Sequence, residues 1–178
     1  MKKVLLVVSG EDFRDEEYFE TKEVLEDEGF YVETASNVPD TAFGSEGGEA
    51  RIDAEIKDID VSGFEGIFLI GGQGALKYLD NDDVYQVFEQ ADESKIFFGA
   101  ICISPVILAR AGLLKNRRAT VWTSPLDKST IKILEKNGAI FVNQPVVQDD
   151  RIITANGPRS AKDFGKKIVE ALSQDEDI

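Results

Sequence analysis

Histidine is missing from this chain of 178 residues, and cysteine occurs once, as Cys102. Histidine is the usual general base near neutral pH and the commonest metal ligand in proteins. Its absence excludes a Ser-His-Asp triad and argues against a zinc site, so we expect no metal and no cofactor. Because a lone cysteine has no partner for an internal disulfide, the composition fits a reducing compartment, and we expect a cytoplasmic protein.

Positive charge and long apolar runs are also scarce. The chain carries 20 lysines and arginines against 34 aspartates and glutamates, which gives a net charge of −14. Nucleic acids and anionic lipid surfaces are bound by clustered cations, so we expect neither as a partner. No apolar run approaches the roughly 20 residues that cross a bilayer, which argues against a membrane protein.

The chain does contain a regular alternation of strand and helix patterns. We predict strands at 4–8, 31–35, 67–70, 95–101, 119–122, 140–142, 146–148 and 151–155, and helices at 16–28, 82–92, 105–111, 129–137 and 160–172. Residues 37–60, rich in glycine, read as a small hairpin excursion. Such alternation predicts an α/β fold with a doubly wound, mostly parallel sheet sandwiched by helices. We expect a single domain over residues 1–172 and a frayed acidic tail over 173–178.

Cys102 lies where this pattern changes from a strand to a helix. Ser104 suits a helix cap, Pro105 the first helical position and Gly112 the left-handed stop. A thiol at a helix N-terminus is close to backbone N–H groups and to the positive end of the helix dipole, which both favour the thiolate. This position predicts a reactive thiol of lowered pKa. The alternative is an inert core residue, since free cysteine is among the most buried residue types.

Several features meet at the carboxyl edge of the predicted sheet, where ligands bind in such folds. They are the acidic segment after the first strand, Gly71-Gly72 after a central strand, and Cys102. A carboxyl beside a thiolate would share a proton with it, although the residues alone do not single out one acid. Gly71 and Gly72 could offer N–H groups to an oxyanion or simply form a tight turn. Arg159, in the turn before the last helix, could bind an anion or serve that turn alone.

The segment AICISP at 100–105 resembles the nucleophile elbow of the ThiJ/PfpI superfamily. It follows the strand that ends in Gly71-Gly72 and precedes AGLL at 111–114, as in that group. The similarity covers most of the chain, from the first strand and helix to ANGP at 155–158 and the last helix. The superfamily includes intracellular proteases, stress chaperones and the parkinsonism-associated deglycase. The resemblance implies a flavodoxin-like fold of the class I glutamine-amidotransferase type and a homodimer.

The resemblance also implies roles for single residues. Its cysteine pairs with a glutamate early in the first helix, and alignment of the helix ends places that role on Glu17. Ile103 stands where protease-like members have histidine, and Ser124 where the deglycase branch has one. With both histidines replaced, we expect no peptidase activity. The residues assigned to the oxyanion and the substrate are Gly71, Gly72, Ile103, Ser124 and Arg159.

Three functions follow as hypotheses. Cys102 could add to a small carbonyl or acyl compound with Glu17 as proton shuttle, which is deglycase-, glyoxalase- or amidase-type chemistry. It could instead oxidise to sulfenic or sulfinic acid in a redox-responsive stress protein without turnover. A receiver-type binding module, suggested by the acidic first loop, ranks last, because the central strand ends in Gly71-Gly72 rather than in an aspartate.

Overall fold

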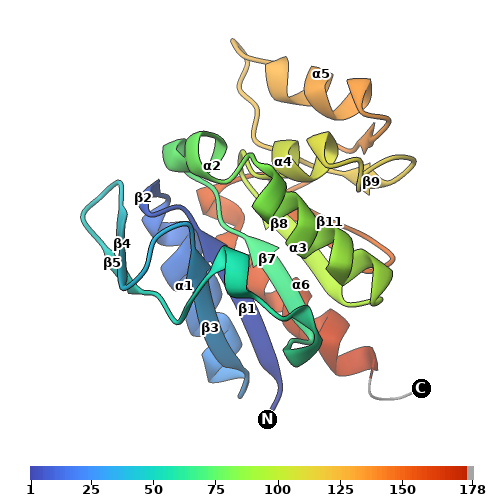
Figure 1. The fold of residues 1–178 in the computed structure, drawn as a ribbon. Helices are drawn as coiled ribbons and strands as arrows, with labels where there is room; N and C mark the ends of the chain where they lie inside the picture. The colour runs from blue at the N-terminus through green and yellow to red at the C-terminus, as the bar shows by residue number, and fades with distance from the viewer. Residues whose placement is uncertain (176–178) are drawn as a thin grey trace.

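A seven-stranded sheet forms the centre of the computed structural model, which describes residues 1–175 (Figure 1). Its strands are β1 Lys3–Val8, β3 Tyr31–Ser36, β6 Ala54–Glu55, β7 Gly66–Leu69, β8 Phe97–Ile101, β11 Val146–Asp149 and β12 Ile152–Ala155. They follow the order β11-β12-β8-β7-β1-β3-β6 across the sheet. Neighbours are parallel except β11, which pairs with β12 antiparallel.

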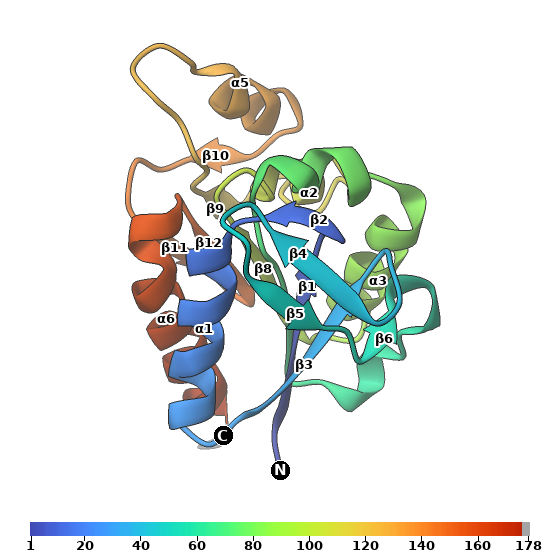
Figure 2. The same cartoon turned by 90° about the vertical axis from the view of Figure 1, so that its left-hand side faces the viewer.

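Helices cover both faces of this sheet. The helices of the described residues are α1 Asp15–Asp27, α2 Gln73–Tyr78, α3 Asp82–Glu93, α4 Pro105–Arg110, α5 Ser129–Lys136 and α6 Ala161–Gln174, with short 3₁₀ turns at η1 Ile56–Asp58, η2 Val61–Gly63 and η3 Pro158–Ser160. Helix α5 packs on α4 and β10, away from the central sheet (Figure 1). Helices α1 and α6 lie side by side over one face (Figure 2), and α3 and α4 pack against β8 from the other. The α/β sandwich predicted from the sequence is therefore confirmed.

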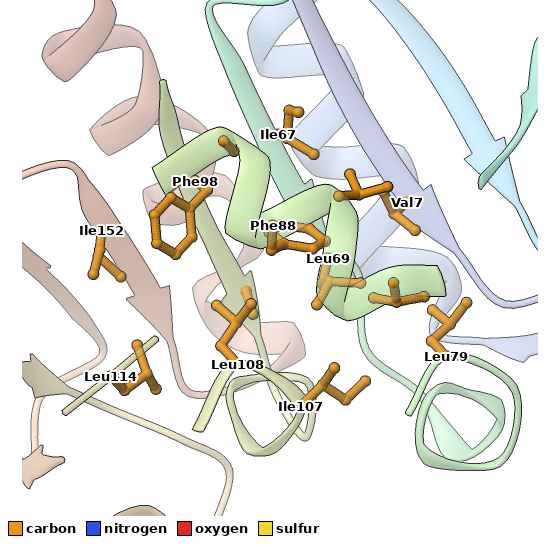
Figure 3. Close-up of a cluster of buried hydrophobic side chains, with 14 of the residues drawn as sticks. Val7, Ile67, Leu69, Leu79, Phe88, Phe98, Ile107, Leu108, Leu114 and Ile152 are labelled. Carbon is orange, nitrogen blue, oxygen red and sulfur yellow. The ribbon is translucent and has the colours of Figure 1, made fainter. Parts of the chain in front are cut away.

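The two hydrophobic clusters of the protein share the sheet between them. Leu5 and Val7 of β1 belong to the cluster under α3 and α4, where Phe88 packs edge-on against Phe98 (Figure 3). The alternate residues of β1 belong to the other cluster, which includes Phe164 of α6. Because successive side chains of a strand point to opposite faces, a strand covered on both sides is apolar throughout. This is why the strands appear in the sequence as continuous apolar runs.

Some elements differ from the prediction. The strand expected at 119–122 shrinks to β9 Arg118–Ala119, which pairs with β10 Ile140–Phe141 outside the central sheet. The next backbone groups bond elsewhere: the N–H of Thr120 donates to Oγ1 of Thr154, and that of Trp122 to the carbonyl of Cys102. Helix α2 and strand β2 Glu11–Phe13 were not predicted.

The glycine-rich excursion contains a hairpin, as expected. Strands β4 Thr41–Gly44 and β5 Glu49–Arg51 pair antiparallel, and β2 joins β4 to form a three-stranded sheet. At the other end of the chain, α6 continues to Gln174, so the first two residues of the expected tail are helical. Residues 176–178 of that tail lie outside the described part. Within residues 1–175, no helix is both long and apolar enough to cross a bilayer.

Candidate functional site around Cys102

Cys102 forms a strained elbow directly after β8. Its φ of 65° lies in the left-handed region, which residues with a side chain rarely adopt. Hydrogen bonds from both sides hold this geometry: the N–H of Cys102 donates to the carbonyl of Ala155 at 2.9 Å, and the carbonyl of Cys102 accepts from the N–H of Trp122 at 2.8 Å. The elbow is thus fastened to β12 on one side and to the segment after β9 on the other.

Ser104 contributes to the elbow in an unexpected way. The residue precedes α4, but its side chain makes no capping hydrogen bond to that helix. Its buried hydroxyl instead donates to the carbonyl of Ile70 at 2.8 Å. Ser104 therefore occupies the expected N-cap position, but its side chain does not cap the helix. Ser104 joins the cysteine elbow to the neighbouring strand end, where Gly71 follows. The expected positions of Pro105 at the start of α4 and of left-handed Gly112 (φ 81°) after it are confirmed.

Glu17 reaches the same place from α1 and is fully buried. Its Oε1 accepts a hydrogen bond from the N–H of Gly71 at 2.9 Å. The carboxyl interacts electrostatically with the Cys102 thiol, yet no hydrogen bond of standard geometry reaches Oε2. Within residues 1–175, Oε2 is the buried side-chain oxygen left without a hydrogen-bond partner. The structure therefore brings Glu17 and Cys102 together with one free acceptor atom between helix and elbow.

Burial controls the charge of this pair. It raises the pKa of Glu17 from an ordinary 4.5 to about 7, although Cys102 and the N–H of Gly71 oppose the change. Burial also raises the pKa of the Cys102 thiol, and the negative charge of Glu17 raises it further. The N–H of Ile103 and the charge of Arg14 lower it, but less.

The lowered thiol pKa expected from the helix position is consequently wrong. The sequence shows that a helix begins after Cys102, but it does not show how deeply the sulfur lies or which charge faces it. Helix α4 has only 6 residues, so its dipole is short. Near neutral pH the sulfur keeps its proton, while Glu17 is partly ionised.

Gly71 and Gly72, the two glycines after β7, differ in position: Gly71 lies between Glu17 and Cys102, and Gly72 lines the cavity. A Cβ on Gly71 would lie 2.6 Å from Oε1 of Glu17 and 2.7 Å from Cβ of Cys102, so only glycine fits between these two residues. Because the N–H of Gly71 donates to Glu17, it is not free for an oxyanion, contrary to expectation. Gly72 has a φ of 114° and lines the cavity at Cys102. Among the described residues, no hydrogen bond engages its N–H.

A cavity of about 690 Å³ opens in front of the sulfur. Leu76, Ile103 and Trp122 give it an apolar wall, while Asp12, Arg14 and Gln73 supply polar groups. Ser45, from the loop between β4 and β5, and Pro158, from η3, complete the lining. Residues from segments far apart in the sequence thus line one cavity at the Cys102 thiol.

Three of the residues expected at the oxyanion and the substrate do not line this cavity: Gly71, Ser124 and Arg159. Ser124 belongs to a turn, where its Oγ accepts a hydrogen bond from the N–H of Asp127 at 3.0 Å. Arg159 is exposed and lines a neighbouring hollow. Trp122 and Pro158, which precede Ser124 and Arg159 in the chain by two residues and by one, line the cavity instead.

Sequence reasoning missed Arg14, Leu76 and Trp122. Leu76 lies on the unpredicted helix α2, and Trp122 was assigned to a strand of the sheet. For Glu17 a signal does exist in the sequence. Glu17, Thr21 and Leu25 recur at intervals of four residues, and all three are buried on the inward face of α1. Glutamate is rarely buried, so a glutamate at a position of the inward face is a sign of a special role.

Comparison with known proteins gives a consistent picture. The profile of the DJ-1/PfpI family matches residues 2–171. An uncharacterized protein of Methanocaldococcus jannaschii is 36% identical over 173 residues, which cover 97% of this chain and 83% of the relative. A protein of Caenorhabditis elegans named glutathione-independent glyoxalase DJR-1.2 is 29% identical over 171 residues, which cover 96% of this chain and 89% of the relative. The crystal structure of a ThiJ/PfpI domain protein from Brachyspira murdochii superposes with a TM-score of 0.90 at 30% identity, covering 97% of this chain and 96% of that one.

Proposed function

The chain belongs to the DJ-1/PfpI family, and on that basis we propose that it converts small reactive carbonyl compounds, with Cys102 as nucleophile and Glu17 as its general base. Methylglyoxal is the test substrate. The observation that carries this proposal is the buried, unpartnered Oε2 of Glu17 beside the thiol. The similarity to a protein named as a glyoxalase supports the same class of substrate.

Glu17 supplies the base that histidine would otherwise provide. A general base works best when its pKa is near the working pH, and burial raises the pKa of Glu17 to about 7. Oε2 accepts the thiol proton as Sγ forms its bond to the aldehyde carbon, and the carbonyl electron pair moves to the oxygen. The proton then passes from Glu17 to that oxygen, which gives a hemithioacetal. Transfer of the C1 proton to C2 through Glu17 converts this adduct into a lactoyl thioester, and water then hydrolyses the thioester to lactate and returns the proton to Sγ. Protonation also removes the negative charge that raises the pKa of the thiol, so proton transfer favours attack.

The cavity has features that suit such a substrate. The N–H of Gly72 is one backbone donor for the developing oxyanion, since Gly71 donates to Glu17. The apolar wall of Leu76, Ile103 and Trp122 excludes water from one side of the sulfur. We propose that Ile103 is part of this wall. Ser124 has no direct contact with substrate in this proposal and stabilises the turn that follows Trp122.

Turnover of methylglyoxal tests the proposal. Disappearance of the substrate and formation of lactate would be followed by nuclear magnetic resonance for the wild type, Cys102→Ala and Ser94→Ala. Ser94 is an exposed residue after α3 and provides a control for a small surface change. We expect lactate from the wild type and from Ser94→Ala but not from Cys102→Ala. Equal lactate formation by Cys102→Ala, or none by the wild type, would contradict the proposal.

A redox-responsive role is the second candidate. It is favoured by the partial exposure of Cys102 and by the lack of a second cysteine that could resolve a sulfenic acid as a disulfide. The raised pKa of the thiol makes oxidation, like nucleophilic attack, depend on transfer of the thiol proton to Glu17, because the thiolate is the form that reacts. Mass spectrometry after stoichiometric peroxide would decide: a two-oxygen adduct on the peptide that carries Cys102 supports this role, and oxidation confined to Met1 contradicts it.

We also propose that the protein is a cytoplasmic homodimer, on the strength of the family resemblance. The chain has a mass of 19.6 kDa. Light scattering at micromolar concentration should give twice this mass, and the mass of the single chain would contradict the dimer.

A further inference from the structure

A second hollow adjoins the cavity at Cys102. It has a volume of about 600 Å³ and lies where α1 and α6 begin, and these helices run side by side (Figure 2). Arg14 and Pro158 line both spaces. Arg159, Lys162 and Lys166 line the hollow but not the cavity. A single molecule bound at the sulfur could therefore extend past Arg14 and Pro158 into the hollow.

The hollow differs from the rest of the protein in its charge. Four cationic and three acidic side chains line it, although the whole chain has 20 cationic against 34 acidic residues. One of the acids is already engaged, because Glu16 forms an ion pair with Arg14 at 2.7 Å. Within residues 1–175, Arg159, Lys162 and Lys166 form neither ion pairs nor side-chain hydrogen bonds. Only Glu20 and Asp163 remain to balance them.

Helix stability does not explain this arrangement of cations. Arg159 lies in η3, which leads directly into α6, and Lys162 is in the first turn of that helix. The start of a helix carries positive partial charge, so cations there are disfavoured and carboxylates are preferred. The unpaired cations outnumber Glu20 and Asp163, and with the N–H groups at this helix end they form one region of excess positive charge next to the cavity at Cys102. Such a region attracts an anion.

We propose that the hollow binds an anionic group, a carboxylate or a phosphate, on the substrate whose carbonyl carbon meets Cys102. The inference rests on the proposed function for the reacting end of that substrate and adds a preference: carbonyl compounds that carry an acid group are bound better than neutral ones such as methylglyoxal. The guanidinium of Arg159 suits two oxygens of one acid group, while Lys162 and Lys166 act as point charges. This assigns to Arg159 the binding of the remote acid group rather than of the oxyanion at the sulfur.

Alkylation of Cys102 tests the subsite without any turnover. Three reagents share the iodoacetyl end, from which Sγ displaces iodide: N-iodoacetyl-β-alanine carries a carboxylate, N-iodoacetyl phosphoethanolamine a phosphate, and N-iodoacetyl-β-alaninamide neither. The ratio of anionic to neutral rate constants at one pH cancels the fraction of thiolate. We expect the double variant Arg159→Gln/Lys162→Gln to lower this ratio about 3- to 10-fold, as the loss of two partly exposed charge contacts would.

A charge control separates the local effect from the net charge of the protein. Lys95 is exposed and precedes β8, so it lies at the opposite end of that strand from Cys102. Lys95→Gln should leave the ratio unchanged. An unchanged ratio in the double variant, or an equal fall in Lys95→Gln, would overturn the proposal. A larger fall of the ratio for the phosphate reagent would show that the hollow prefers a phosphate. A larger fall for the carboxylate reagent would show that it prefers a carboxylate.

A second measurement keeps the proposal independent of cysteine reactivity. Trp122 is the only tryptophan of the chain and lines the cavity. Quenching of its fluorescence by iodide, relative to quenching by neutral acrylamide, reports the local potential. The double variant should lower this relative quenching, and no change would overturn the anion subsite. If none of the reagents alkylates Cys102, the proposed function fails, and the quenching result alone decides the subsite.

Discussion

Two buried carboxylates in the first turn of α1, Asp15 and Glu17, differ in their hydrogen bonds. Both oxygens of Asp15 are bonded: Oδ1 accepts from the N–H of Glu46 at 2.9 Å, and Oδ2 from the N–H of Gly48 at 2.8 Å. Glu17 accepts one bond at Oε1, from Gly71, and none at Oε2. Both oxygens of Asp15 therefore have a hydrogen-bond donor, whereas Glu17 has one oxygen without a donor beside the Cys102 thiol.

This difference separates a structural role from a chemical one. Asp15 ties the loop between β4 and β5 to the start of α1, and a Cβ on Gly44 or Gly48 would lie within 2.5 Å of its carboxylate. The same loop brings Ser45 to the cavity. A buried polar atom without a partner typically costs about 1–3 kcal/mol. Native structures contain few such atoms, and a catalytic role is one explanation for them. Under the proposed function, Asp15 stabilises the fold and Glu17 serves as the base.

The largest expected effect is on turnover by Glu17→Gln. The amide cannot accept the thiol proton, so kcat/KM for methylglyoxal should fall by about 10²–10⁴-fold, the usual contribution of a positioned general base. Steady-state kinetics would be compared with those of Glu23→Gln, which changes an exposed glutamate of the same helix. Asp15→Asn should lose far less activity per folded molecule. If Asp15→Asn and Glu17→Gln lose equal activity, the two carboxylates do not differ in the way proposed.

The next effect is on the pH dependence of stability. The pKa of Glu17 is about 7 in the folded protein against an ordinary 4.5, so ionisation opposes folding. Its contribution to stability is fully present below about pH 4.5 and is lost as the pH rises to about 7. Relative to Glu17→Gln, the wild type should therefore lose roughly 3 kcal/mol of unfolding free energy over this range. Urea unfolding of both proteins at several pH values measures the difference, and parallel stability curves would refute it.

A smaller effect is expected for Asp15→Asn. The amide replaces one acceptor oxygen by an N–H donor that faces a backbone N–H, which should lower stability by about 1–3 kcal/mol. Amide hydrogen exchange at Glu46 and Gly48 should accelerate at the same time. Asp27→Asn, at an exposed position near the end of α1, is the matched control. Unaltered exchange at both amides would show that Asp15 does not hold the loop.

Much of the fold could be predicted because its strands are covered on both faces. This makes apolar runs such as 4–8 and 67–70 stand out, and glycine at 29 and 138 marks where helices end with positive φ. Helix α2 was missed because it begins at Gln73 and Gly74 directly after a double glycine, a sequence that favours a turn. Gly74 fits there because a Cβ would lie 1.8 Å from the carbonyl oxygen of Glu11.

The site was less accessible to prediction than the fold. The position of Cys102 at an elbow followed from local sequence, but its burial and the charge opposite it depend on segments far away in the chain. The pairing with Glu17 came from a family resemblance, and the binding of its Oε1 to Gly71 could not be foreseen, since it joins residues 54 positions apart. For the same reason, the wall residue Trp122 and the cationic hollow beside Arg14 emerge only in three dimensions.

Direct titration of Glu17 tests whether this carboxyl can be the base that receives the proton of Cys102. The side-chain carboxyl of Glu17, assigned by its absence in Glu17→Gln, can be followed by carbon-13 nuclear magnetic resonance as the pH is varied. We expect a midpoint of about 7, since burial and the unpartnered Oε2 disfavour the charged form. A midpoint near the ordinary 4.5 would show that Glu17 is ionised throughout the neutral range and would contradict its role as the base that receives the proton of Cys102.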